Sequence, residues 1–177
     1  AHHVVRALSI SYYTGLRPGQ VELLTLRWTD VDFDAGEILI RSARKGGLKR
    51  RLVPLHPAFA AELRKWYDLD EAAARDNIRY NGRYIIHYNG RPIKRIQKAF
   101  DRAKQRAGIT RRLRPYDFRH AFATALLRSG GDLKGTSEIL GHTRPDTTMR
   151  VYHHTDTALH RGIINRLPAL EGRKTTE

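Results

Sequence analysis

The chain of 177 residues contains no cysteine, which excludes disulfide bonds and thiolate metal ligands and suits a reducing cytosol. No stretch approaches the ~18 consecutive apolar residues of a membrane-spanning helix, and the first residues lack the apolar core of a signal peptide. Neither a P-loop nor a His-Glu-x-x-His pattern occurs, and there is no internal repeat. We therefore expect a cytoplasmic protein that makes no membrane contact and uses no metal or other cofactor.

What the sequence has in excess is positive charge. It carries 33 Lys and Arg residues against 18 Asp and Glu, a formal net charge of +15. Such an excess favours a polyanionic partner, because basic side chains bind phosphates and release counterions. A hydrophobic content of 40% is enough for a globular core, and the length fits a single domain. The composition predicts a folded nucleic-acid-binding domain, but a basic ribonucleoprotein component would share it.

Apolar spacing and chain breakers predict a mostly helical domain that carries a small antiparallel sheet. The expected helices cover residues 4–13, 18–28, 57–67, 70–77, 93–107, 115–129, 133–140, 145–152 and 157–167. The expected strands cover residues 37–41, 51–55 and 84–87. The first two strands flank Lys45, Gly46 and Gly47, a combination typical of a hairpin turn.

Two arginines stand at predicted helix starts. Arg17 precedes a helix that opens at Pro18, and Arg119 lies in the first turn after Pro115. The unpaired N–H groups and the dipole of a helix N-terminus favour anions, so an arginine placed beside one completes an oxyanion site. An arginine taken alone is more often an ordinary surface charge.

Lys45 lies in a hairpin that is basic throughout, together with Arg44, Lys49, Arg50 and Arg51. One interpretation is a solvated hairpin that touches the DNA backbone. The other is a mobile lysine that donates a proton to a leaving alkoxide.

His142 and Tyr152 flank a predicted helix near the end of the chain. A phenol with a pKa near ~10 is a poor nucleophile at neutral pH unless cations or a base activate it. A tyrosine taken alone, such as Tyr152, is more often an ordinary amphipathic residue than a nucleophile. His120, His153 and His154 add imidazoles, but the sequence offers no recognisable zinc motif.

These residues occur within four segments in a fixed order. The segments are 14–28 (with Arg17, Leu24, Leu26 and Trp28), 45–55 (with Lys45), 117–124 (with Arg119) and 140–152 (with His142 and Tyr152). In composition and order, they resemble the signature segments of the tyrosine recombinases, the family of phage and mobile-element integrases. The resemblance covers residues 4 to 155.

The resemblance implies a fold that is mainly α with a small antiparallel β-sheet (α+β), the DNA breaking-rejoining fold of a tyrosine recombinase catalytic domain. It implies that Tyr152 attacks a scissile phosphate, giving a 3′-phosphotyrosyl link and a free 5′-hydroxyl. Arg17 and Arg119 would hold the non-bridging oxygens. Lys45 would protonate the leaving 5′-oxygen, and His142 would assist at the phosphate. A partner strand's 5′-hydroxyl reverses the step without ATP or metal.

The chain departs from the family pattern at three places. An acidic residue usually stands three positions after the first arginine, but here that position holds Gln20, and Glu22 follows two residues later, so either could fill the role. Tyr116 stands where the second segment often begins with histidine; a phenol still hydrogen-bonds a phosphate oxygen but shuttles protons poorly at neutral pH. The step from His142 to Tyr152 is ten residues, one longer than in many members. We count Tyr116, Gln20, Glu22 and His120 as assisting candidates.

The expected catalytic domain covers residues 1–170 and a disordered tail covers 171–177, with the family's N-terminal core-binding domain absent from this chain. The expected partner is double-stranded DNA, which the full-length protein would bind as a homotetramer together with accessory DNA-bending proteins. The isolated domain is expected to be monomeric. The predicted DNA contacts are Arg44, Lys49, Arg50, Arg51, Lys94 and Arg95. The 157–167 segment would pack on its own domain or on a neighbouring protomer.

The resemblance implies integration or excision of a phage or mobile element, and a location in the bacterial cytoplasm and nucleoid or in the phage host. Two alternatives stay open. A type IB topoisomerase would use the same chemistry without a recombination partner. A non-catalytic DNA-binding module would keep the fold and form no covalent adduct.

Overall fold

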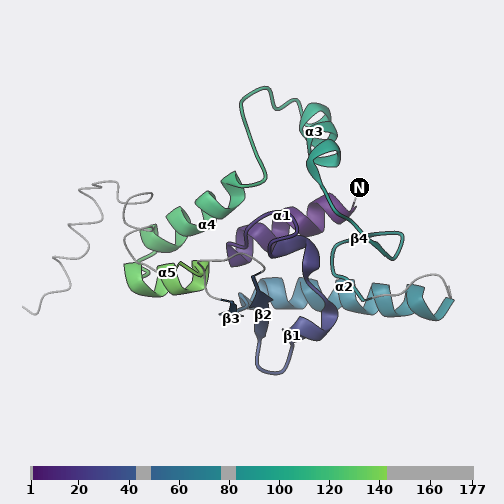
Figure 1. Cartoon of the computed structure of the whole chain (residues 1–177), viewed down its shortest axis with the longest axis horizontal. Helices are drawn as coiled ribbons and strands as arrows, with labels where there is room; N and C mark the ends of the chain where they lie inside the picture. Colours follow the sequence, from purple (N-terminus) through teal and green to yellow (C-terminus); the bar gives the residue numbers. More distant parts are fainter. Residues whose placement is uncertain (1, 43–48, 77–82, 143–177) are drawn as a thin grey trace, which may run out of the picture.

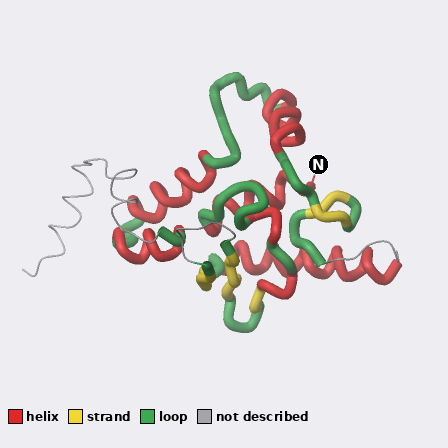
Figure 2. Tube along the Cα trace, in the orientation of Figure 1, coloured by secondary structure: helices red, strands yellow, loops and turns green. Residues whose placement is uncertain are grey.

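The computed structural model describes residues 2–42, 49–76 and 83–142. In Figure 1, helix α1 (His2–Thr14) is central, with α3 (Gln97–Arg106) above it and α2 (Pro57–Asp76) and a small sheet below. Helices α4 (Asp117–Arg128) and α5 (Leu133–Leu140) lie on the left, and α4 contacts both α1 and α5. Figure 2 shows that helix predominates over strand, which confirms the predicted fold class. None of the described helices is long and apolar enough to cross a membrane.

The main sheet has three antiparallel strands in the order β1 (Val31–Asp32), β2 (Glu37–Arg41) and β3 (Arg50–Pro54). The predicted hairpin is confirmed, with Ile38 paired to Val53 and Ile40 paired to Arg51. Ile38, Ile40 and Val53 are buried because alternate residues of a strand face the same side. This inward face of the sheet also carries Arg51.

Three differences concern strands. Strand β1 was not predicted, since two residues are too few to show alternation. A separate two-stranded ladder pairs β4 (His87–Tyr88) with β5 (Arg91–Pro92). The predicted 84–87 strand therefore starts later than expected, and Tyr84 forms only an isolated bridge with Arg27.

The predicted break between two helices at residues 67–70 is wrong, because α2 runs without interruption from Pro57 to Asp76. Phe59, Leu63 and Trp66 are buried at helical spacing, which agrees with the helix predicted over 57–67. Asp70 lies on the same face of the helix and is buried as well. The apolar periodicity of the helix ends at Asp70 because this buried residue is charged, and the sequence therefore suggested a break there.

The predicted α-helix at 18–28 is also wrong. The segment forms turns and two short 3₁₀ helices, η1 (Leu23–Thr25) and η2 (Trp28–Asp30). Gly19 has a φ of +85°, which an α-helix does not use, and the Glu22 carboxylate accepts a hydrogen bond from the Arg17 backbone N–H at 2.9 Å. Side-chain bonds to the backbone compete with the helix ladder. The outcome is that Glu22 folds back against Arg17.

The helices of the last third largely match the predictions. Helix α3 begins at Gln97, four residues later than expected, and α4 covers Asp117–Arg128. At the start of α5, Asp132 accepts a hydrogen bond from the Gly135 N–H, and Gly141 ends the helix with a φ of +72°. The predicted helices at 145–152 and 157–167 and the tail at 171–177 lie outside the described residues.

A buried ion network joins α1, α2 and β4, and it includes Trp28 of the first signature segment. Arg6 donates to both Asp70 oxygens, at 2.7 and 2.9 Å, and the Trp28 indole donates to Asp70 at 3.0 Å. The Nδ1 atom of His87 accepts from the Gly90 N–H at 3.1 Å. Burial alone would raise the pKa of Asp70, but the hydrogen bonds from His87 and Arg6 outweigh it and hold that pKa well below its usual range.

Candidate active site

Five residues from separate segments meet where α1 ends. Arg17 follows α1, Glu22 lies in the turn after it, Arg51 is on β3, Arg119 is on α4 and His142 follows α5. The elements that carry them are in contact, with α1 against α4, α4 against α5, and α5 against β3. The sequence-predicted residues Arg17, Arg119 and His142 are therefore brought together, and Glu22 and Arg51 complete the group.

Arg119 is fully buried at the centre of this group. Its Nη1 donates to the Gly15 carbonyl at 2.6 Å and its Nη2 to the Leu140 carbonyl at 2.7 Å. Within the described part of the chain, its Nε has no hydrogen-bond partner although it is buried. Burial lowers the pKa of the Arg119 guanidinium, but an arginine stays charged at any physiological pH. A buried cation with an unsatisfied N–H is suited to an anionic ligand.

Of the two candidates for the position after the first arginine, Glu22 lies in the site and Gln20 does not. Gln20 is exposed, whereas Glu22 is 1% exposed and accepts a bidentate pair of hydrogen bonds from Arg51 at 3.0 and 2.9 Å. Its other cations are farther away, with Arg17 Nη1 at 3.5 Å and Arg119 Nη1 at 4.0 Å. Burial would raise the pKa of Glu22, but the Arg51 hydrogen bonds and charge outweigh it and lower the pKa below its ordinary value.

The arginines outnumber the carboxylate. Three guanidinium groups, those of Arg17, Arg51 and Arg119, lie within 4.0 Å of Glu22, so two positive charges are left over within this group. The Arg17 side chain keeps 16% of its surface exposed, and its Nη1 reaches Ser42 Oγ at 3.4 Å. Arg17 therefore marks the side of the group that solvent reaches.

His142 is neutral at physiological pH. Burial, followed by the charges of Arg119, Arg17 and Arg51, lowers its pKa to about 4. Its Nε2 lies 3.1 Å from Arg119 Nη2. Because an arginine only donates, Nε2 must accept, which places the imidazole proton on Nδ1.

Two glycines allow the close approaches in this site. A Cβ on Gly15 would lie 2.4 Å from Cδ1 of Phe122, and a Cβ on Gly141 would lie 2.8 Å from Nη1 of Arg51. Both glycines also have positive φ, of +64° and +72°. The sequence identified them as helix breaks, but not as contact points for α4 and β3.

The other predicted residues are placed as follows. Tyr116 is 39% exposed, and its ring packs edge-on against His120 with centroids 4.7 Å apart. Burial lowers the pKa of His120 below its ordinary value. The predicted DNA contacts Lys49, Arg50, Lys94 and Arg95 are exposed. Lys45, Arg44 and Tyr152 lie outside the described residues.

The prediction that Arg51 is an exposed DNA contact is wrong. Its side chain is only 5% exposed and is taken up by Glu22 and by the Ile139 carbonyl, to which Nε donates at 2.7 Å. The signal was present in the sequence, because Arg51, Val53 and Leu55 alternate along one strand and therefore share a face. The positive charge of Arg51 favoured an exposed position, whereas the two-residue period of the strand predicted a buried one.

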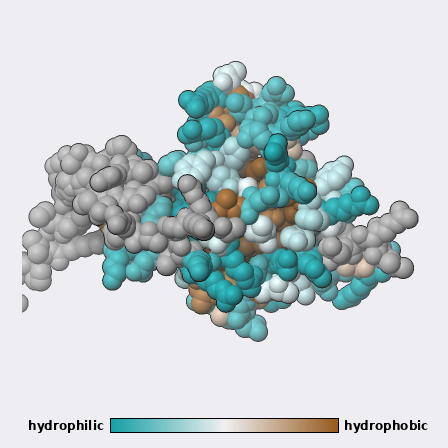
Figure 3. Space-filling model, in the orientation of Figure 1, coloured by the Kyte–Doolittle hydropathy of each residue, from teal (hydrophilic) through white to brown (hydrophobic). Residues whose placement is uncertain are grey.

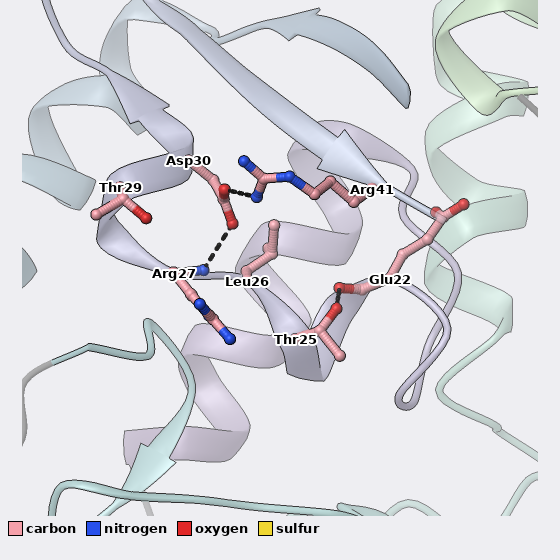
Figure 4. Close-up of a pocket in the computed structure, with 7 residues that line it drawn as sticks. All are labelled: Glu22, Thr25, Leu26, Arg27, Thr29, Asp30 and Arg41. Carbon is pink, nitrogen blue, oxygen red and sulfur yellow. Dashed lines mark hydrogen bonds and ion pairs between the residues drawn. The ribbon is translucent and has the colours of Figure 1, made fainter. Parts of the chain in front are cut away.

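A pocket of about 300 Å³ lies next to the site (Figure 4). It is lined by Arg27, Asp30 and Arg41, with two threonines, Leu26 and Glu22. Arg41 is paired with Asp30, and the Glu22 carbonyl accepts from the Thr25 hydroxyl at 2.8 Å. In Figure 4, the Glu22 carboxylate lies at the right of the picture and points away from the paired Arg41 and Asp30. The site residues Arg17, Glu22, Arg51, Arg119 and His142 are called the arginine group below. The pocket shares only Glu22 with this group and therefore adjoins it without containing it.

The acidic member of the site serves as a partner for cations of the protein itself. Glu22 is held by arginines through both of its carboxylate oxygens. Across residues 2–42, 49–76 and 83–142, no group of three or more His, Asp or Glu side chains is arranged to hold a metal ion.

Comparison with known proteins gives one family. The family model described as "Phage integrase family" matches residues 3–158. Tyrosine recombinase XerC of Xylella fastidiosa (strain 9a5c) is 36% identical over 151 residues, which cover 84% of this chain and 47% of that protein. An integrase/recombinase of Escherichia coli is 31% identical over 195 residues, covering 90% of this chain and 56% of that protein. The chain thus spans about half the length of these relatives.

Solved structures agree. The crystal structure of XerA recombinase has a TM-score of 0.67 at 28% identity, over 95% of this chain and 64% of that one. XerH site-specific recombinase bound to its palindromic difH substrate, in a post-cleavage complex, has a TM-score of 0.66 at 25% identity, over 89% of this chain and 44% of that one. The catalytic domain of bacteriophage HP1 integrase, at 22% identity and a TM-score of 0.58, shares the fold.

Proposed function

The chain belongs to the phage integrase family of tyrosine recombinases, and we propose that the arginine group around Glu22 is the phosphate site of a domain that cleaves and rejoins DNA. The observation that carries this proposal is the convergence of Arg17, Arg119 and His142 from three segments into one positively charged group. An isolated surface arginine would need no such assembly.

The charge and hydrogen bonding of the group support a phosphate ligand. Two positive charges are uncompensated, and the Arg119 Nε is buried without a partner in the described part of the chain. A phosphodiester brings one negative charge and acceptor oxygens. Attack by the nucleophile makes phosphorus five-coordinate, and the non-bridging oxygens then carry more negative charge. Preorganised donors stabilise that change strongly where water is excluded.

The proposed reaction conserves the phosphoester bond energy. The Tyr152 phenol loses its proton to solvent as its oxygen forms a bond to phosphorus. The bond from phosphorus to the 5′-oxygen breaks, and the Lys45 ammonium gives that oxygen a proton. Arg17 and Arg119 hold the non-bridging oxygens, and neutral His142 supports Arg119 through Nε2. A 5′-hydroxyl of the partner strand then attacks the phosphotyrosine and gives its proton to the Lys45 amine. The bond between phosphorus and the Tyr152 oxygen breaks, Tyr152 regains a proton from solvent, and the strands are rejoined.

The exposed basic surface supports double-stranded DNA as the partner. Figure 3 shows mainly hydrophilic side chains over the upper part of the view, where Figure 1 places α3. Exposed basic residues of this region are Arg91, Lys94, Arg95, Lys98, Arg102, Arg106, Arg111, Arg112 and Arg114. Such a surface binds the DNA backbone without reading sequence. We propose that the full-length protein assembles on DNA for integration or excision of a mobile element.

A covalent adduct is the direct test. The purified chain is incubated with a pool of nicked DNA duplexes of randomised sequence, so that no target site need be known. Protein-linked DNA is separated on a denaturing gel and sequenced. We expect an adduct through a 3′-phosphate, its loss in Tyr152→Phe, and its retention in the matched control Tyr12→Phe, since Tyr12 is an exposed residue of α1.

The alternatives give different results in the same experiment. Adducts that lead to plasmid relaxation without strand exchange between two duplexes would indicate a topoisomerase. DNA binding without any adduct, unchanged by Tyr152→Phe, would indicate a binding module and overturn the proposal.

A further inference from the structure

Arg51 connects the three parts of the arginine group, yet it is not one of the residues assigned to the phosphate. Its guanidinium holds both Glu22 oxygens and donates through Nε to the Ile139 carbonyl near the end of α5. Its own strand, β3, leads back to residues 43–48, which include Lys45. One side chain on β3 thus links that strand to the Glu22 turn and to the segment before His142.

Direct contact between Arg51 and DNA does not fit its surroundings. Its Nε and both Nη atoms are already engaged with protein acceptors, whereas the still more buried Arg119 keeps an Nε that has no partner in the described part of the chain. Gly141 leaves the space that this guanidinium fills, since a Cβ there would lie 2.8 Å from Nη1 and 3.0 Å from Cζ. The fold is therefore built around Arg51 at this point.

The distances around Glu22 show what Arg51 does for the other arginines. Glu22 pairs with Arg51 at 2.9 Å but lies 3.5 Å from Arg17 Nη1 and 4.0 Å from Arg119 Nη1. A buried carboxylate needs charged partners, and both its oxygens are satisfied by the Arg51 fork. Without Arg51, the nearest cations left to Glu22 are Arg17 and Arg119. Both already form long ion pairs with Glu22, so without Arg51 either would be drawn closer to the carboxylate and away from a phosphate.

We propose that Arg51 is a positioning residue of the phosphate site: by occupying Glu22, it keeps Arg17 and Arg119 available to an anion. This inference deepens the proposed function, and it concerns the anion site whether or not the chain cleaves DNA. It follows that, when Arg51 is removed, the Glu22 carboxylate is the group that weakens anion binding, because it then competes with the anion for Arg17 and Arg119.

The test uses inorganic phosphate as the probe and isothermal titration calorimetry of the whole chain as the measurement. The variants are Arg51→Met, Glu22→Gln and the double variant Arg51→Met/Glu22→Gln. We expect Arg51→Met to lower phosphate affinity by about tenfold or more, the scale of one charged hydrogen-bonded contact. The double variant should recover to within about threefold of Glu22→Gln, because no carboxylate is left to capture Arg17 or Arg119.

Arg6→Met is the matched control. Arg6 also makes a buried bidentate pair, with Asp70, and its side chain is 6% exposed, but it lies outside the arginine group. It should lose as much thermal stability as Arg51→Met and keep wild-type phosphate affinity. A loss of phosphate affinity in Arg6→Met equal to that in Arg51→Met would show a general folding effect and overturn the proposal.

Two further results decide the matter. Wild-type affinity in Arg51→Met would refute a positioning role. If Arg51→Met does not fold, the comparison of Glu22→Gln with the double variant remains, and a tenfold gap between them would mean that Arg51 itself binds the anion. Absence of DNA adducts in the wild type, with phosphate binding as predicted, would overturn the proposed function and leave this inference standing.

Discussion

The Arg119 guanidinium donates to the carbonyl oxygen of Gly15 across 104 positions of sequence, at 2.6 Å. This bond joins the segment that carries Arg17 to the helix that carries Arg119, so the two predicted phosphate ligands are fixed relative to each other by the protein backbone. The ring of Phe122, one turn further along α4, closes the same contact against Gly15. The junction between α1 and α4 is therefore both a packing contact and part of the candidate active site.

Gly15→Ala should destabilise the protein more than an equivalent change at an open glycine. The new Cβ would lie 2.4 Å from Phe122 Cδ1 at a φ of +64°. Backbone strain and overpacking together predict a loss of about 3 kcal/mol in the free energy of unfolding. Urea denaturation measures it.

The control for that change is Gly36→Ala. Gly36 has a φ of +66°, and a Cβ added to it would meet no atom of the described residues within 4 Å. Only backbone strain then applies, and about 1 kcal/mol should be lost. Equal losses in the two variants would mean that Phe122 moves aside without cost.

Asp70→Asn should lower stability without affecting phosphate chemistry. The amide cannot neutralise Arg6, which stays buried at 5% exposure, and a loss of about 3 kcal/mol in the free energy of unfolding follows. Asp68→Asn, at an exposed position on the same helix, should cost almost nothing. Calorimetric unfolding compares the two, and phosphate titration of folded Asp70→Asn should match wild type. Weakened phosphate binding would show that the two buried networks are coupled.

His142 should make stability depend on pH between about 4 and the ordinary histidine value near 6.5. Its pKa in the folded protein is lowered to about 4, so within this window the unfolded chain binds more protons. The contribution of His142 to the free energy of unfolding is therefore complete above pH 6.5 and is lost as the pH falls toward 4.

The comparison with His142→Gln isolates this effect from the other titrating groups. The stability difference between wild type and variant should change by on the order of 1 kcal/mol across the window, a value reduced for the partial exposure of the ring. Urea denaturation at half-unit pH steps measures it. Parallel curves for the two proteins would show that His142 titrates normally.

The Lys94→Ala/Arg95→Ala variant should bind duplex DNA more weakly and with less salt dependence. Both side chains are exposed just before α3. Removing two phosphate contacts should reduce the slope of log affinity against log salt by about 2. Fluorescence anisotropy with one labelled duplex over a salt series measures that slope.

Lys65→Ala/Arg75→Ala makes the same change of charge on α2, at exposed positions on the opposite side of α1 from α3 in Figure 1. Its slope should stay close to that of the wild type. If both double variants lose affinity equally, DNA responds to net charge alone and no particular surface is used.

The sequence by itself determined the features that depend on near neighbours in the chain. The inward spacing of Phe59, Leu63 and Trp66 predicted the first half of α2, and Gly141 marked the end of α5. The excess of basic residues predicted the class of partner, and the four ordered segments predicted the family, which the comparisons confirmed. Helical period, strand alternation and capping are local, and so they can be read without a fold.

Only the tertiary structure decided which charged residues meet. Glu22 rather than Gln20 faces the arginines because the turn after Arg17 folds back on itself. Arg51 pairs with Glu22 across 29 positions, and Arg119 reaches Leu140 and Gly15 through helix contacts. A buried charge is stable only beside its partner, and that partner is set by the packing of distant elements rather than by local pattern. For this reason the sequence placed Arg51 on the surface, and the fold places it beneath the candidate active site.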